Sequence, residues 1–69
     1  MINIKFNKNL YSLKAIKSAA KLYNNVADFI FAEDKNYIKL TLKNIDKEVK
    51  SVIKDEFCNY VLFLMQIKK

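Results

Sequence analysis

The last third of the chain, residues 46–69, carries the pattern that most limits how this sequence can fold. Apolar residues recur there at steps of three and four, the spacing of one face of an α-helix. They are Ile45, Val49, Val52, Ile53, Phe57, Tyr60, Val61, Leu64 and Ile67. No Gly or Pro interrupts the stretch, so we predict a helix over residues 46–67, about 33 Å long. The rest of so small a domain is then expected to pack along this helix.

Polar residues at both ends of the stretch agree with a helix that runs its whole length. Asn44 or Asp46 could cap the start, and Asp46 and Glu48 lie near the positive end of the helix dipole. Lys68 and Lys69 lie at the negative end.

A second apolar stripe follows the later half of this predicted helix. Cys58, Leu62 and Met65 are spaced by four and three, and Phe63 lies beside them. A small domain cannot cover both sides of a helix. We therefore predict that these four residues form a contact surface for another protein or for a second copy of this chain.

Length and composition indicate a single domain over residues 1–69. Hydrophobic residues make up 52% of the chain, which is ample for a core and argues against disorder. The single cysteine, Cys58, has no partner for an internal disulfide, which is typical of a reducing cytosol. The N-terminus lacks the apolar run of a signal peptide, and the longest apolar run, residues 60–65, is far below the ~20 residues that span a bilayer. We expect a cytoplasmic protein with no membrane contact.

The chain before the long helix predicts a strand, a helix and a hairpin. Alternation of Ile2, Ile4 and Phe6 with polar residues indicates a half-buried strand. A helix follows over residues 13–24, with Ser12 as its N-cap and Asn24-Asn25 ending it through a left-handed residue. Its inward stripe is Leu13, Ile16, Ala19, Ala20 and Tyr23.

Two alternating stretches, residues 28–32 and 37–43, flank the polar turn Glu33–Asn36 and predict a β-hairpin. The expected order is therefore β-α-β-β-α. This is an α+β domain, in which a three-stranded, mainly antiparallel sheet packs on two helices.

The net charge of +6 comes entirely from lysine, because the chain has neither Arg nor His. Lys14, Lys17 and Lys21 fall on the outer side of the first predicted helix. This basic stripe could steer an acidic peptide or a phosphate backbone toward the protein. Since arginine is the usual residue for bidentate recognition of phosphate or guanine, its absence makes nucleic acid the weaker expectation.

The residues do not support catalysis. Without His there is no imidazole base or zinc ligand, and Cys58 has no His to activate it as a nucleophile. A Gly-rich phosphate loop is impossible without Gly. Asp55 and Glu56 are adjacent and point about 100° apart on a helix, so they do not form a catalytic pair. We expect a protein that is not an enzyme and holds no metal or cofactor.

Two stretches resemble the HxsD-like family. Residues 10–23, LYSLKAIKSAAKLY, are similar to its first helix, which has a Leu-Tyr pair, then Ala-Ile, then Ala-Ala before an aromatic residue. Residues 56–62, EFCNYVL, followed by Ile67-Lys68, are similar to its Phe-x-Asn signature with two aliphatics, a polar pair and a closing Leu-Arg. Here Phe63 and Leu64 stand in place of the polar pair, and Lys68 in place of the Arg.

The resemblance implies a small non-catalytic component of a ribosomal-peptide maturation system. Such a protein would bind a radical SAM maturase, its precursor peptide, or both, and the iron–sulfur chemistry would belong to the maturase. Two alternatives stay open: a basic nucleic-acid-binding or regulatory domain, and a self-associating structural module that dimerises through the C-terminal helix.

Overall fold

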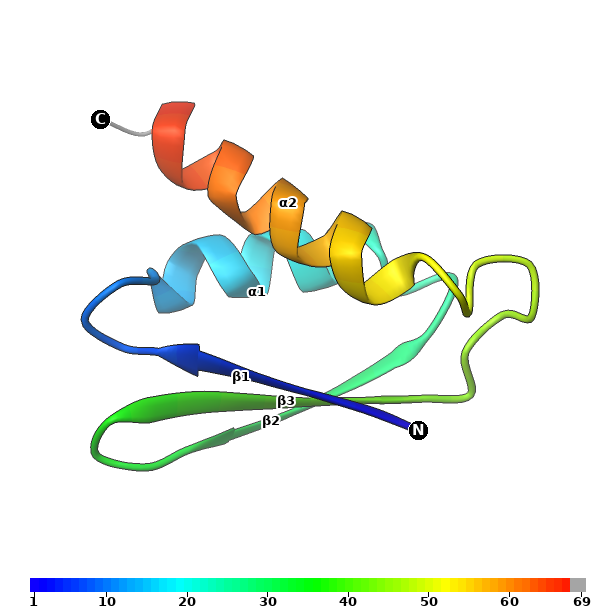
Figure 1. Ribbon diagram of the computed structural model, residues 1–69, viewed down its shortest axis with the longest axis horizontal. Coiled ribbons are helices and arrows are strands. Elements are labelled where there is room, and N and C mark those ends of the chain that lie inside the picture. Colours follow the sequence, from blue (N-terminus) through cyan, green and yellow to red (C-terminus); the bar gives the residue numbers. More distant parts are fainter. Residues whose placement is uncertain (68–69) are drawn as a thin grey trace.

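A computed structural model of the chain describes residues 1–67. Its elements are β1 (Ile2–Asn7), α1 (Leu13–Leu22), β2 (Asp28–Glu33), β3 (Tyr37–Lys43) and α2 (Ile53–Ile67). The strands form one sheet of order β1-β3-β2, and both helices lie on the same face of it (Figure 1). The predicted α+β class and the β-α-β-β-α order are confirmed.

The sheet is built around β3, which pairs antiparallel with both of its neighbours. Because β1 and β2 are each antiparallel to β3, they run parallel to one another. The connection between them contains α1 and crosses over β3, which lies between them in the sheet. The alternation in β3 turns Ile38, Leu40 and Leu42 toward the helices, where each is 0–1% exposed. The period-2 pattern of the sequence therefore determined which face of the sheet is covered.

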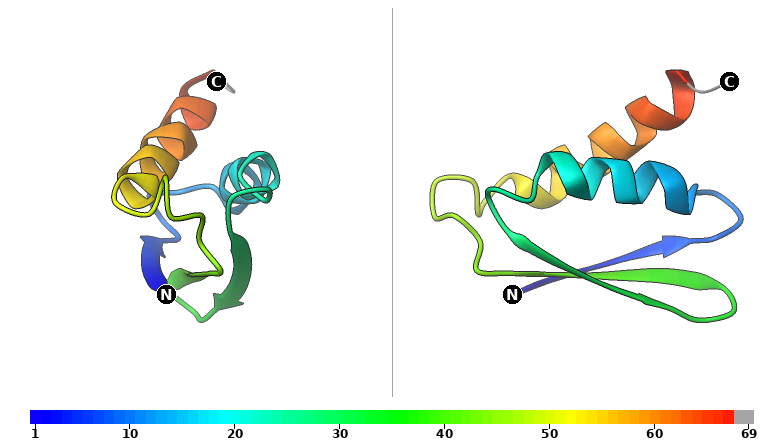
Figure 2. Two further views of the ribbon diagram at one scale, coloured as in Figure 1. Left: turned by 90° about the vertical axis from the view of Figure 1, so that its right-hand side faces the viewer. Right: turned by 180° about the vertical axis from the view of Figure 1, so that it is seen from behind.

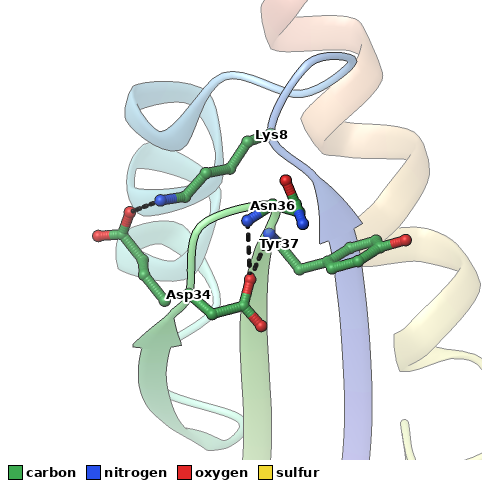
Figure 3. A network of polar contacts seen from close by, with 5 residues as sticks. Lys8, Asp34, Asn36 and Tyr37 are labelled. Carbon is green, nitrogen blue, oxygen red and sulfur yellow. Dashed lines mark hydrogen bonds and ion pairs between the residues drawn. The ribbon is translucent and has the colours of Figure 1, made fainter.

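The turn between β2 and β3 is organised by the carboxylate of Asp34. Its Oδ1 accepts hydrogen bonds from the backbone N–H groups of Asn36 and Tyr37, at 2.9 and 2.8 Å (Figure 3). These two hydrogen bonds lower the pKa of Asp34, and the Lys39 ammonium, 3.4 Å away, lowers it further by a smaller amount. Close to this turn, Lys8, which directly follows β1, forms an ion pair with Glu33 at the end of β2, at 2.9 Å.

We predict that the Asp34→Asn variant is less stable than the wild type at neutral pH, and that the difference disappears in acid. The pKa of Asp34 is lower in the folded state than its ordinary value of 3.8, so its charge stabilises the fold above that value. The contribution is lost as the pH falls through the folded pKa. Urea unfolding between pH 2 and pH 7 measures this, and a constant offset between the two proteins would contradict it.

Helix α1 begins where the sequence predicts, since the Ser12 hydroxyl accepts a hydrogen bond from the Ala15 N–H at 3.2 Å. Its buried side chains are Ala15, Ile16, Ala19 and Ala20. The predicted end is wrong. The helix stops at Leu22, and Asn24-Asn25 do not take a left-handed conformation. Among residues 1–67 only Asn44, which directly follows β3, has a positive φ, of 51°.

Helix α2 is shorter than expected, because the predicted start at residue 46 is wrong. Residues 47–52 form turns and the helix begins at Ile53. The N–H of Asp46 bonds to the Val26 carbonyl in the α1–β2 connection at 2.8 Å, and its Oδ1 accepts from the Glu48 N–H at 3.0 Å. Asp46 therefore anchors a turn rather than a helix start. The lysines placed at the helix C-terminus, Lys68 and Lys69, lie outside the described residues.

The core fills the space between the sheet and the two helices. From α2 it takes Ile53, Phe57, Val61 and Leu64, which are 0–9% exposed. Seen end-on, α2 lies over the β1 side of the sheet and α1 over the β2 side (Figure 2). The last turns of α2 rise away from the sheet (Figures 1 and 2).

Candidate partner-binding surfaces on the helical layer

An apolar cleft lies where the end of α1 meets the start of α2. It has a volume of about 280 Å³. Its lining residues come from α1, the following connection, the 47–52 turn segment and α2: Leu22, Tyr23, Asn25, Val26, Val49, Ile53, Glu56 and Tyr60. The volume is slightly below the ~300 Å³ at which small-molecule sites begin. It therefore suits a single side chain better than a nucleotide or a large cofactor.

Aromatic rings connect this cleft to the exposed part of α2. The rings of Tyr23 and Tyr60 lie 6.0 Å apart, and Tyr60 stacks on Phe63 at 5.9 Å. Burial raises the pKa of Tyr23, and the nearby Glu56 carboxylate and Tyr60 raise it further. Glu56 is itself exposed and one turn before Tyr60 on the same side of α2. The cleft thus has aromatic walls and one carboxylate at its rim.

The predicted C-terminal stripe is partly accessible. Leu62 and Phe63 are 41% and 51% exposed in the second half of α2. Cys58 and Met65 are instead half-buried and pack against the core. Successive helical residues are about 100° apart, so Phe63 faces the Tyr60 flank while Cys58, Leu62 and Met65 share the other flank. The structure therefore divides the four predicted residues between two sides of one helix.

Cys58 has the environment of a packed thiol. Partial burial raises its pKa, an effect that Lys54 opposes and Asp55 reinforces. The thiol is consequently protonated at neutral pH, whereas nucleophilic or metal-binding cysteines need the thiolate. This environment favours a packing role over a chemical one.

The basic stripe on α1 lies where the sequence predicts it. Lys14, Lys17 and Lys21 are exposed, and together with Leu13 and Ser18 they line a shallow groove on the outer side of the helix. None of the three lysines forms an ion pair with another of the described residues. Their charge is available to an external acidic group.

The open face of the sheet is a poor platform for stacked bases. Tyr37 is its one aromatic side chain, and the Lys5 ammonium lies over that ring at 4.5 Å from the centroid. On the same face Thr41 donates a hydrogen bond to the Asn3 side chain at 3.0 Å. Sheets that bind single strands offer two or three free rings, which this face lacks.

Residues 1–67 contain no cluster of His, Cys, Asp and Glu side chains able to hold a metal ion. None of the helices in that part of the chain has the length and apolarity to cross a bilayer. Comparisons with protein-family models, curated proteins and solved structures find no match.

The residue spacing does not predict the cleft. It places Tyr23 and Tyr60 on the inward sides of their helices, and it shows Glu56 next to Asp55 without indicating a binding site. The signal that could have found them is the spacing of Glu56 and Tyr60, four residues apart on one helix side. Phenol groups also prefer the boundary between core and water, where their hydroxyl can be hydrated.

Proposed function

We propose that this chain is a non-catalytic binding protein of a ribosomal-peptide maturation system, which contacts a radical SAM maturase, its precursor peptide, or both. The observation that carries the binding function is the exposure of Leu62 and Phe63 in the second half of α2. Large apolar side chains that stay exposed next to one another along a helix favour a contact surface, although Leu62 and Phe63 lie on different flanks of α2. The kind of system is proposed from the resemblance to the HxsD-like family.

Two parts of the helical layer have different roles in this proposal. Leu62, with the half-buried Cys58 and Met65 on the same flank of α2, would form the hydrophobic centre of the contact, and Phe63 would extend it on the other flank. Lys14, Lys17 and Lys21 would attract an acidic leader segment over a longer range. The maturase would supply the iron–sulfur chemistry, and this chain would supply recognition or presentation of the peptide.

We predict separate kinetic effects for the two surfaces. Leu62→Asp should speed dissociation about 30-fold, as for a central contact worth about 2 kcal/mol. Reversing both Lys17 and Lys21 to Glu should slow association and flatten its salt dependence. The matched control reverses Lys47 and Lys50, which are also exposed but lie in the turn segment before α2. Surface plasmon resonance with immobilised maturase or precursor peptide measures both rates at several salt concentrations.

The same experiment separates this proposal from its alternatives. If neither maturase nor peptide binds at tens of micromolar while random duplex DNA does, the maturation function is wrong and nucleic-acid binding replaces it. Light scattering tests self-association, because dimers through α2 should dissociate in the Leu62→Asp variant. A wild type that is dimeric and binds no other partner would indicate the structural module.

A further inference from the structure

The cleft between α1 and α2 combines three features that favour a positively charged occupant. Tyr23 and Tyr60 present two rings, 6.0 Å apart and tilted by 53°, and the Glu56 carboxylate stands at the rim. Aromatic faces attract cations through the ring quadrupole, with the ammonium or guanidinium within about 6 Å of the ring. Within residues 1–67, Glu56 has no ion-pair partner.

We infer that this cleft binds a lysine or arginine side chain of a partner polypeptide, with the apolar stem against Tyr23 and Tyr60 and the charge at Glu56. Leu22, Val26, Val49 and Ile53 provide the apolar part of the lining. The stem of a long basic side chain packs well on such a surface while its charge reaches the rim. The inference rests on the proposed binding function and adds the chemistry of one contact.

The local charge explains why a cation is preferred although the whole chain is basic. The lysines of the basic stripe lie on the outer side of α1 and line a different groove, and none of the lysines among residues 1–67 lines the cleft. The raised pKa of Tyr23, caused by burial and then by Glu56 and Tyr60, agrees with a partly dehydrated, negatively charged surrounding. Both conditions disfavour an acidic side chain at this place.

The test uses the full chain and two blocked tripeptides, one with arginine between two alanines and one with citrulline, its neutral analogue. Titration followed by two-dimensional NMR should shift the signals of Tyr23, Glu56 and Tyr60 on addition of the arginine peptide. We expect the citrulline peptide to bind about fivefold more weakly. Glu56→Gln should weaken arginine binding about fivefold and leave citrulline binding unchanged. Tyr60→Leu should weaken arginine binding as well, whereas Tyr60→Phe, which keeps the ring, should not.

Asp55→Asn is the matched control, because both acidic residues lie in the first turn of α2. It changes the net charge by the same amount without touching the cleft lining, and it should bind the arginine peptide like the wild type. The inference would be overturned if the arginine and citrulline peptides bound equally well, or if Asp55→Asn and Glu56→Gln lost the same amount of arginine-peptide binding. NMR shifts confined to residues outside the cleft would overturn it as well. Normal complexes of Glu56→Gln with both the maturase and the precursor peptide would also overturn it while leaving the proposed function intact. Conversely, absence of a maturase complex leaves the tripeptide result to stand by itself.

Discussion

Replacing Phe57 by Ala is expected to remove about 3–5 kcal/mol of unfolding free energy, a large part of the total stability of a small domain. Phe57 is 0% exposed. Its ring lies 5.2 Å from Phe29, 5.7 Å from Tyr23 and 6.4 Å from Phe6. From its place on α2 it therefore contacts β2, β1 and the residue that directly follows α1. Truncation would leave a cavity where all the elements that surround it meet.

Urea unfolding followed by circular dichroism measures the loss. Phe63→Ala is the matched control, because it removes the same ring from the same helix at a site that is 51% exposed. Its unfolding free energy should stay much closer to that of the wild type. A Phe57→Ala protein that melts together with the Phe63→Ala protein would show that α2 does not hold the core together.

The Ala19→Leu variant is expected to lose about 1–3 kcal/mol through overpacking. Ala19 is 0% exposed, and Ala15 beside it is 1% exposed. Alanine and leucine differ little in helix propensity, so the loss would come from tertiary contacts. Since small residues let α1 approach the rest of the core closely, a larger side chain would force it away or into a strained rotamer.

Lys14→Leu provides the comparison, because it places the same side chain on the exposed side of α1. Chemical denaturation of both variants should separate them clearly, with Lys14→Leu near the wild type. If Ala19→Leu unfolds at the same urea concentration as Lys14→Leu, the position of α1 adjusts freely and close approach is not required for the fold.

The features predicted correctly depend on contacts that are near in sequence. The Ser12 cap bonds to Ala15, three residues ahead, and the Asp34 turn is closed by its next neighbours. Alternation in β3 places Ile38, Leu40 and Leu42 on one face whatever the strand pairs with. The order β-α-β-β-α followed from these local signals.

The start of α2 was predicted too early because spacing by three does not distinguish a helix from consecutive turns. The Val49 N–H bonds to the Asp46 carbonyl and the Val52 N–H to the Val49 carbonyl, both across three residues. Val49 consequently packs against the core while Val52 is 42% exposed. The hydrogen bond from the Asp46 N–H to the Val26 carbonyl helps to hold this turn, and no local pattern indicates a partner twenty residues away.

The sequence by itself determined the elements, the covered face of the sheet and the basic side of α1, because these follow from periodicity and short-range hydrogen bonds. The tertiary structure decided which apolar residues of α2 stay exposed. Met65 packs on the core and Leu62 does not, since the angle at which α2 leaves the sheet depends on the whole core. It also formed the cleft, by bringing Tyr23 of the first helix against Tyr60 of the second. Such juxtapositions result from packing between distant segments, which residue spacing along the chain cannot express.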